Sequence, residues 1–281
     1  MEVKKRMSED IVIIEENEDK TITTIRMNNL AKKNAFGVPL AMALREAFDK
    51  VERSDARVVI LTGGEDVFSS GIDLMSFSGQ KGEIEGYNPP NSANPHNMRY
   101  FTNTWLHPIL SRIENMEKPV IAKIKGYCWG IALEMALACD FRFAMDNSSF
   151  CLPEANMGFN PDVGGLIRAT RVLGIAAAKD IILTARKFDG NEAFRLGVIN
   201  GVAKTSEELE TQIKNYTDEL IDSAPLAVGI SKRLIDMCYG QNLRYGMDLE
   251  TLASSYLLQT KDSKAGAIAR LQRTKPKWTG K

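Results

Sequence analysis

The sequence predicts an α/β fold followed by a helical region. Two observations predict it. A β-like run, a glycine turn and a segment with helical spacing of apolar residues follow one another from residue 57 on, and again over residues 119–138. The β-like runs stop after residues 198–202, and the pattern beyond them is helical. We therefore expect a β-rich core over residues 1–204 and a helical region over residues 205–281.

The first predicted elements are a hairpin, a helix and a strand. Residues 11–16 and 20–27 are rich in Ile, Val and Thr around a polar turn, which is typical of a β-hairpin. Apolar residues recur at helical spacing over residues 38–53, and residues 57–62 read as a strand that a Gly-Gly pair ends. A short helical pattern then begins near Ile72.

The later elements repeat this order. A strand at residues 119–125 leads through glycine to an apolar helix at residues 130–138. The remaining predictions are strands at 140–145, 149–152 and 198–202, helices at 163–173 and 175–184, and helices from 205 onward with breaks near Pro225 and Gly240.

A segment rich in Gly, Pro, Asn and Ser lies at residues 76–95 and predicts a long loop. Such a loop is either a tolerated surface insertion or a lid over a substrate, and its position in the sequence leaves both open.

Composition excludes several classes of protein. The 281 residues are 44% hydrophobic and 26% charged, as in ordinary globular domains, which argues against disordered and collagen-like chains. Lys plus Arg and Asp plus Glu both total 36, so a formal net charge of zero gives no bulk attraction to nucleic acid or anionic membranes. Apolar runs fall far short of the roughly 18 residues of a membrane span. We expect neither a nucleic-acid nor a membrane partner.

The cysteines and the N-terminal residues predict a cytoplasmic location. The four cysteines form no C-x-x-C pair and lie mostly in apolar stretches, which is typical of free thiols in a reducing compartment. The first basic residues precede acidic ones instead of an apolar segment, so we expect no secretory signal.

Few residues are available for histidine or metal chemistry. His96 and His107 are the two histidines, and no G-x-S-x-G, H-E-x-x-H, EF-hand, Walker A or G-x-G-x-x-G motif occurs. We therefore expect no metal site, and carboxylates and backbone groups must carry any chemistry.

Four motifs in order carry a resemblance to a known family. They are MNNLAKKNA at residues 27–35, VFSSGIDL at 67–74, GYCWGIALE at 126–134 followed by ACD at 138–140, and LPEANMG at 152–158 closed by PDVGG at 161–165. They resemble segments of the crotonase family, the enoyl-CoA hydratase/isomerase superfamily, and the resemblance covers nearly the whole chain. It implies an α/β crotonase (ClpP/crotonase-like) fold, in which ββα turns coil into a superhelix and a C-terminal helical trimerisation region follows. It also implies a homo-oligomer, either a trimer or a dimer of trimers.

The resemblance assigns an oxyanion hole to two backbone amides. By motif position these are the amides of Ile72 and Ile131, which would hold the oxygen of a coenzyme A thioester while a thioenolate forms. Ile131 stands where the family usually has glycine. A β-branched residue there keeps the amide but restricts the backbone and reshapes the acyl pocket.

Two glutamates match the catalytic pair of the family's hydratases. Glu134 interrupts an apolar helix, and Glu154 lies in the fourth motif. One would take a proton from water while the other supplies the proton delivered to C2, and burial and mutual repulsion should raise their pKa values. Family members that only shift a double bond commonly lack the acid at the Glu134 position, so both acids together favour a hydratase or dehydratase.

Asp162 leaves alternatives open. Dienoyl-CoA isomerases carry an acid at this position, and a carnitinyl-CoA dehydratase-like pattern resembles this stretch as well. Without the resemblance, Asp162 would read as the N-cap of the helix that follows.

The resemblance also places the coenzyme A part of the substrate. The residues implied in substrate binding are Lys33, Ala35, Ser70, Asp73, Leu74 and Gly130. No cofactor is expected, since coenzyme A is part of the substrate.

These observations predict an enzyme, an enoyl-CoA hydratase or dehydratase acting by syn addition or removal of water. The alternatives are another acyl-CoA reaction in the same site, either dienoyl-CoA isomerisation using Asp162 or hydrolysis of a cyclic β-keto acyl-CoA. A further alternative is a non-catalytic family member that binds a coenzyme A ester or RNA.

Overall fold

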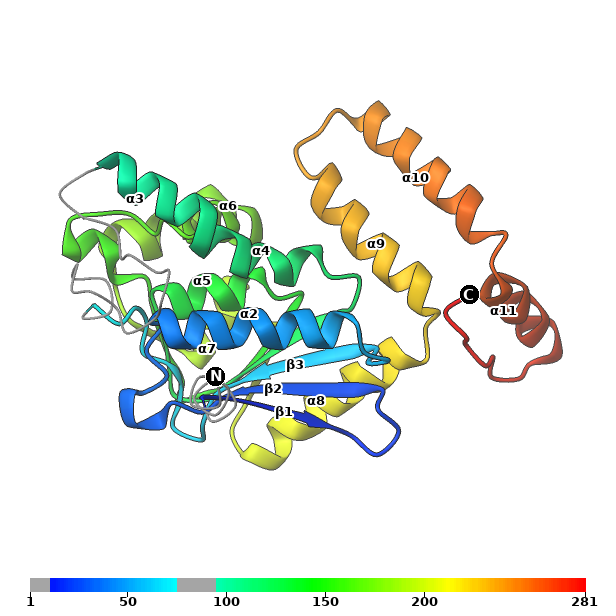
Figure 1. Ribbon diagram of the computed structural model, residues 1–281, viewed down its shortest axis with the longest axis horizontal. Helices are drawn as coiled ribbons and strands as arrows, with labels where there is room; N and C mark the ends of the chain where they lie inside the picture. Colours follow the sequence, from blue (N-terminus) through cyan, green and yellow to red (C-terminus); the bar gives the residue numbers. More distant parts are fainter. Residues whose placement is uncertain (1–10, 75–94) are drawn as a thin grey trace, which may run out of the picture.

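A six-stranded sheet forms the framework of the molecule (Figure 1). The computed structural model describes residues 11–74 and 95–281. β1 and β2 form an antiparallel hairpin, and the other strands of this sheet run parallel. In spatial order the strands are β1 (Val12–Glu16), β2 (Ile22–Met27), β3 (Val58–Thr62), β5 (Val120–Ile124), β7 (Phe141–Met145) and β10 (Gly201–Ala203).

A second, four-stranded sheet runs beside the first. Its strands are, in order, β4 (Val67–Ser69), β6 (Tyr127–Trp129), β8 (Ser149–Cys151) and β9 (Phe188–Asp189). Each of β3, β5 and β7 leads directly into the next strand of this second sheet, so each of these three turns of the chain adds one strand to each sheet. Gly126 makes one such corner with φ of +66°, where a Cβ would overlap the carbonyl oxygen of Asp66. The repeating unit is therefore two strands and a helix, coiled into a superhelix.

Helices cover both faces of the larger sheet (Figure 1). One face packs on α8, through Leu209 and Ile213 against Val58, Ile121 and Phe143. The opposite face carries the main apolar core, which includes every residue of α5 except the buried Glu134. The helices of the core are α2 (Val38–Glu52), α3 (Pro95–Phe101), α4 (His107–Asn115), α5 (Ile131–Ala138), α6 (Gly165–Thr184), α7 (Gly190–Leu196) and α8 (Ser206–Ile221). Short helical turns are η1 (Leu30–Lys32), the π-helical η2 (Thr102–Leu106) and η3 (Pro153–Met157).

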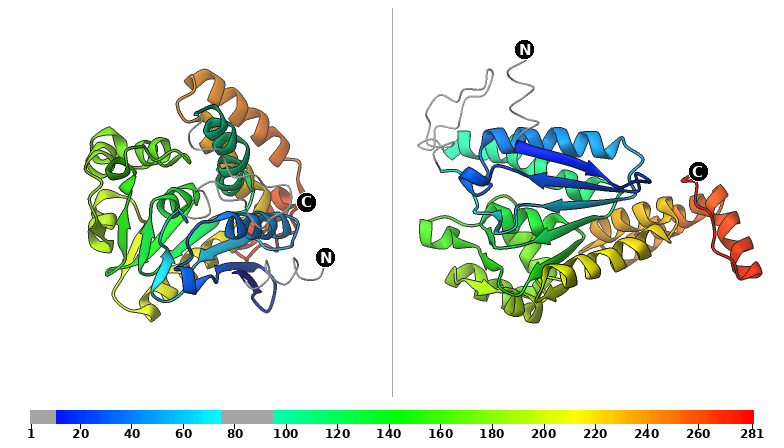
Figure 2. Two further views of the ribbon diagram at one scale, coloured as in Figure 1. Left: turned by 60° about the vertical axis from the view of Figure 1, so that its left-hand side comes forward. Right: turned by 90° about the horizontal axis from the view of Figure 1, so that it is seen from below.

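The last three helices extend away from the sheets (Figures 1 and 2). They are α9 (Pro225–Cys238), α10 (Leu243–Leu257) and α11 (Lys261–Gln272). Lys232 joins α9 to the core, because its buried ammonium pairs with Asp140 at 2.8 Å and donates to the carbonyl oxygens of Ile113 and Lys118. Within the described part of the chain, no helix has the length and apolar character to cross a membrane.

Most predicted elements are confirmed, with shifts at their ends. The hairpin, the helix from residue 38, and the strands that became β3, β5, β7 and β8 all form. The strand predicted at residues 198–202 is wrong in position, because β10 begins only at Gly201 after a turn that follows α7. The prediction of a helix near Ile72 is wrong at that residue, which forms a β-bridge with Phe36.

The sequence analysis missed three short strands, and two of its other predictions are not tested by the described residues. The strands β4, β6 and β9 were not predicted, because two or three residues are too few to show a period of two. The predicted loop at residues 76–95 lies outside the described residues except for Pro95, which begins α3. The division at residue 204 stays a prediction, and α8, just beyond it, packs on the large sheet.

Candidate active site

Three carboxyl groups interact around the N-terminal half of α5. Glu134 lies in the first turn of that helix, Glu154 lies on η3, and Asp162 lies in the loop before α6. The charges of Glu154 and Asp162 both act on Glu134. The structure therefore brings together the three acids that the sequence predicted, from a helix, a helical turn and a loop.

Glu134 is buried and anchored by backbone amides. Glu134 is 2% exposed. Its Oε2 accepts hydrogen bonds from the backbone amides of Val163 (2.9 Å) and Gly165 (2.7 Å). Burial raises the pKa of Glu134 to about 8, the charges of the two neighbouring acids add to this rise, and the two amide bonds oppose it. Gly165 makes this approach possible, since a Cβ there would overlap the Glu134 side chain.

Glu154 has an orphaned carboxyl oxygen. The residue is buried, and among the described residues its Oε2 has no hydrogen-bond partner. Burial is the main cause that raises the pKa of Glu154 to about 7. The other oxygen, Oε1, faces Gly130, where a Cβ would lie 2.8 Å from it. A buried, unpaired carboxyl oxygen beside the start of α5 is available to a ligand or a water molecule.

Asp162 occupies a more open position. Its Oδ2 accepts a hydrogen bond from Thr102 at 3.4 Å, and its carbonyl oxygen contacts His107 Nε2 at 2.7 Å. Partial desolvation raises the pKa of Asp162, and the Thr102 bond works against this rise. Because the residue is exposed, solvent screens the effect. Gly164 is the residue that caps α6, so the reading of Asp162 as a helix N-cap is wrong.

The two predicted backbone donors follow glycines in tight turns. Gly71 (φ +99°) precedes Ile72, and Gly130 (φ +54°) precedes Ile131. The two turns touch, since a Cβ on Gly71 would lie 2.9 Å from the carbonyl oxygen of Trp129. Within the described residues, neither the Ile72 nor the Ile131 amide donates a hydrogen bond. Ile131 is the first residue of α5, where helix geometry leaves the amide unpaired and the helix dipole favours negative charge.

The residues predicted to bind coenzyme A lie on two loops that are tied together. The Ser70 amide donates to the Lys33 carbonyl at 3.0 Å, and the Asp73 side chain pairs with Lys32 at 3.2 Å. Ala35 is half-buried in the same segment, and Leu74 is exposed at the end of the second loop. The second loop approaches the turn that contains Gly130 where Gly71 faces the Trp129 carbonyl, so the six predicted residues lie on segments that contact one another.

Sequence reasoning missed the groups that hold this site in shape. The amides of Val163 and Gly165 bind Glu134, and Arg168 binds both Glu114 and the Val163 carbonyl. The Gly-Gly pair of the fourth motif was a visible signal of a tight backbone approach. Nothing local in the sequence shows which carboxylate approaches it.

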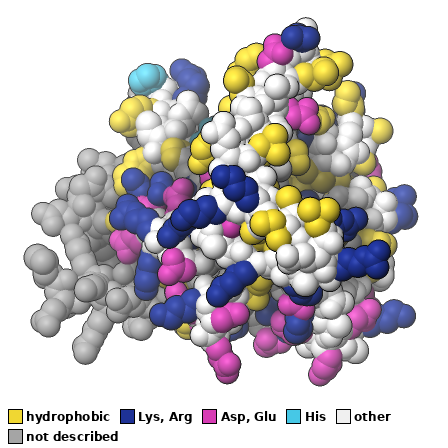
Figure 3. All heavy atoms as spheres, turned by 90° about the vertical axis from the view of Figure 1, so that its right-hand side faces the viewer, with side chains coloured by type: hydrophobic (Ala, Val, Ile, Leu, Met, Phe, Trp, Pro, Cys, Tyr) yellow, Lys and Arg dark blue, Asp and Glu magenta, His cyan; other side chains and the backbone are white. Residues whose placement is uncertain are grey.

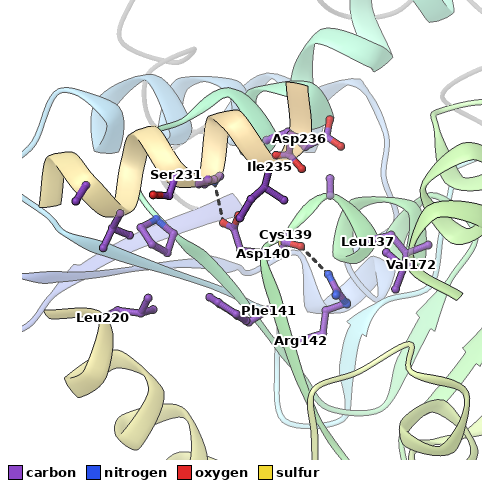
Figure 4. Close-up of a pocket in the computed structure, with 16 residues that line it drawn as sticks. Leu137, Cys139, Asp140, Phe141, Arg142, Val172, Leu220, Ser231, Ile235 and Asp236 are labelled. Atoms are coloured by element: carbon purple, nitrogen blue, oxygen red, sulfur yellow. Dashed lines mark hydrogen bonds and ion pairs between the residues drawn. The ribbon is translucent and has the colours of Figure 1, made fainter. Parts of the chain in front are cut away.

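A cavity of about 580 Å³ lies elsewhere, between α9 and the segment that follows α5 (Figure 4). Leu137, Phe141, Val172 and Ile235 line it, and the pair of Asp140 and Lys232 closes one wall. It contains none of the three carboxylates described above. We therefore locate the candidate active site by its acids and unpaired amides, whose chemistry is specific, and not by this cavity.

Fold and site together define a class of protein: an α/β superhelical enzyme with buried acids beside unpaired backbone amides. The model of one family, enoyl-CoA hydratase/isomerase, matches residues 17–281. The chain belongs to the enoyl-CoA hydratase/isomerase family. The predicted crotonase fold is thereby confirmed, as is the family resemblance.

Named relatives and solved structures agree with this assignment. A carnitinyl-CoA dehydratase of Salmonella arizonae is 34% identical over 89% of this chain and 92% of its own length. A probable mitochondrial enoyl-CoA hydratase 2 of Arabidopsis thaliana is 30% identical over 93% of this chain and 83% of its own length. The crystal structure of an enoyl-CoA hydratase from Bacillus anthracis matches with a TM-score of 0.85 and 27% identity, over 96% of this chain and 100% of that chain.

Proposed function

We propose that this enzyme adds water to the double bond of a 2-enoyl-CoA thioester, or removes water in the reverse direction. The observation that carries the proposal is the pair of buried acids, Glu134 and Glu154, beside the unpaired amide of Ile131. The relatives named above as carnitinyl-CoA dehydratase and enoyl-CoA hydratase support it.

In the proposed reaction, the amides of Ile72 and Ile131 hold the thioester oxygen. Negative charge grows on this oxygen as the thioenolate forms, so the two donors bind the transition state more strongly than the substrate. One such donor typically contributes about 2.7–4 kcal/mol. The first turn of α5 adds its dipole at the same place.

The two glutamates share the proton transfers. A carboxylate must accept a proton from the attacking water, and a carboxylic acid must deliver one to C2. Since burial raises both pKa values to near neutrality, the pair can hold one proton in the pH range of the cell. The orphaned Oε2 of Glu154 supports a water or substrate contact there.

The substrate would lie along the edge formed by the two tied loops. Lys33, Ala35 and Ser70 suit the nucleotide part, and Asp73, Leu74 and Gly130 lead toward the thioester. This reaction takes no metal and no cofactor beyond the coenzyme A of the substrate.

Asp162 favours a second candidate, dienoyl-CoA isomerisation in the same site. Its charge acts on both Glu134 and Glu154, so a third acid is close enough to take part in proton transfer. A dienoyl-CoA substrate converted without uptake of water would favour this alternative.

We also propose a homo-oligomer, a trimer or a dimer of trimers, in the cytoplasm. Large apolar side chains are exposed on the C-terminal helices, and Figure 3 shows them gathered on that side of the molecule. Such patches support an interface between subunits. All four cysteines are free thiols, which supports a reducing compartment.

The test follows the loss of the conjugated-thioester absorbance when purified protein meets crotonyl-CoA. We expect rapid loss with the parent and a fall of about 10²-fold or more in kcat for Glu134→Gln and for Glu154→Gln. Glu219→Gln, an exposed change on α8, is the matched control. A folded parent that binds crotonyl-CoA without changing its absorbance would contradict hydration of this substrate.

A further inference from the structure

The loop at residues 163–165 is held from two sides. On the inner side, the amides of Val163 and Gly165 donate to Glu134 Oε2. On the outer side, Arg168 Nη1 donates to the Val163 carbonyl oxygen at 2.8 Å. These groups belong to three consecutive peptide units. The peptide unit that Arg168 holds therefore lies between the two peptide units whose amides bind Glu134.

Arg168 is itself fixed by a carboxylate from another helix. Its Nε donates to Glu114 Oε1 and its Nη2 donates to Glu114 Oε2, both at 2.7 Å, so the contact is bidentate. Glu114 lies on α4, Arg168 lies on α6, and the Arg168 side chain is largely buried. The guanidinium rests on Gly164 (φ +94°), where a Cβ would overlap Nη1. A bidentate pair of this kind has a defined geometry that a lysine cannot reproduce.

We propose that Glu114 and Arg168 form a positioning pair, which keeps the Val163 and Gly165 amides on Glu134 and so sets the charge state in which this acid works. The pair contacts the loop at the Val163 carbonyl oxygen and acts on Glu134 through it. The effect on Glu134 itself is independent of the reaction, whereas the effect on turnover rests on the proposed hydratase function.

The expected sign follows from the groups around Glu134. The charged and titratable groups that face it or its loop are Glu154, Asp162, Glu114, Arg168 and His107. Burial and the neighbouring acids raise the pKa of Glu134, and the two amide bonds lower it. A loop that relaxes away therefore raises this pKa further.

The experiment compares Arg168→Lys with Arg171→Lys. Arg171 is the matched control, because it lies on the same helix but is exposed over the ring of Tyr239. The readouts are the titration of the Glu134 carboxyl carbon by ¹³C NMR, assigned with Glu134→Gln, and the pH profile of kcat for crotonyl-CoA. For Arg168→Lys we expect the pKa of Glu134 to rise by about one unit, as for one lost hydrogen bond to a charged group. The part of the kcat pH profile that depends on the titration of Glu134 should shift by the same amount. Arg171→Lys should leave both the Glu134 titration and the kcat profile unchanged.

The outcomes separate the two proposals. A folded Arg168→Lys variant with an unchanged Glu134 titration overturns the positioning pair. If that variant does not fold, Glu114→Gln gives the same test, since it keeps the side-chain shape and removes the charge. If the titration shifts but the parent is inert on crotonyl-CoA, the positioning pair stands and the hydratase proposal falls.

Discussion

The first turn of α5 and its surroundings bury acidic side chains, whereas the helices α9–α11 expose apolar surface. Around α5, Glu134 and Glu154 are buried, and Glu134 takes two amide bonds that offset part of its desolvation. On the C-terminal helices the pattern is reversed. Ile235, Leu243 and Leu271 are among the exposed large apolar side chains, and Leu271 is 85% exposed. One region is organised within a single chain, and the other presents surface that a single chain leaves uncovered.

This difference separates a region suited to chemistry from a surface that supports the proposed assembly. A buried acid costs stability unless its surroundings compensate for it, so a pair of such acids points to chemistry. Apolar side chains in water cost little individually, but a contiguous set points to a partner. Lys232 fixes α9 to the core through Asp140 and two backbone carbonyl oxygens, and replacing it tests the comparison most strongly.

Lys232→Met should have the largest effect on stability. It leaves the partly buried Asp140 without its cation and removes two hydrogen bonds to the carbonyl oxygens of Ile113 and Lys118. We expect the free energy of unfolding in urea to fall by about 3–5 kcal/mol. Lys214→Met breaks an exposed i,i+4 pair with Asp218 and should cost only about 0.3–0.5 kcal/mol. Equal losses in the two variants would contradict the view that α9 is anchored by a buried charge.

Gly130→Ala should have the next largest effect, on activity. Gly130 has φ of +54°, and a Cβ there would lie 2.8 Å from Glu154 Oε1. The change strains the turn before Ile131 and displaces an acid, so we expect kcat for crotonyl-CoA to fall about 10²-fold. Gly174→Ala is the control, because Gly174 also has a positive φ (+77°) but no atom lies within 4 Å of the added Cβ. That variant should lose about 1–3 kcal/mol of stability, because Gly174 has a φ of +77° and a ψ of 166°, and should keep its kcat. If both variants lose activity equally, backbone strain alone explains the loss, and the position of Gly130 beside Glu154 does not matter for kcat.

The sequence predicted the parts of the fold that follow from local pattern. The helix at α2 and the strand β3 were visible because their apolar residues recur with the period of the element. Strands β4 and β6 were not, because each has three residues and is set by pairing with a neighbouring strand. The carboxylates of the site came from the family resemblance and were expected to lie together. Residues that act through tertiary contacts, such as Arg168 and Glu114, gave no local signal, since 54 residues separate them in the chain.

Glu134→Gln should change how stability depends on pH. The pKa of Glu134 is raised from 4.5 to about 8 by folding, so the native state binds a proton that the unfolded state releases in this range. Stability therefore falls as pH rises from about 4.5 to about 8, at up to about 1.4 kcal/mol per pH unit. Glutamine keeps an acceptor for the two amides but does not titrate. We expect the variant to gain stability relative to the parent between pH 5 and pH 9 in urea titrations, whereas exposed Glu219→Gln should run parallel to the parent. A constant difference between Glu134→Gln and the parent would contradict the raised pKa.

Leu271→Ser should have the smallest effect on the stability of the single chain, and it tests the exposed apolar surface of the C-terminal helices. Leu271 is exposed on α11, so a polar replacement should change the unfolding free energy of the monomer by no more than about 0.5 kcal/mol. If the side chain lies in a subunit interface, the same change removes apolar area that association buries, and analytical ultracentrifugation should detect smaller species at lower concentration. Gln272→Ser, on the same helix, should leave the association unchanged. An assembly that tolerates Leu271→Ser would place the interface on other exposed residues of α9 and α10. A loss of monomer stability instead would mean that α11 packs within its own chain, and the two regions would then differ less than their surfaces suggest.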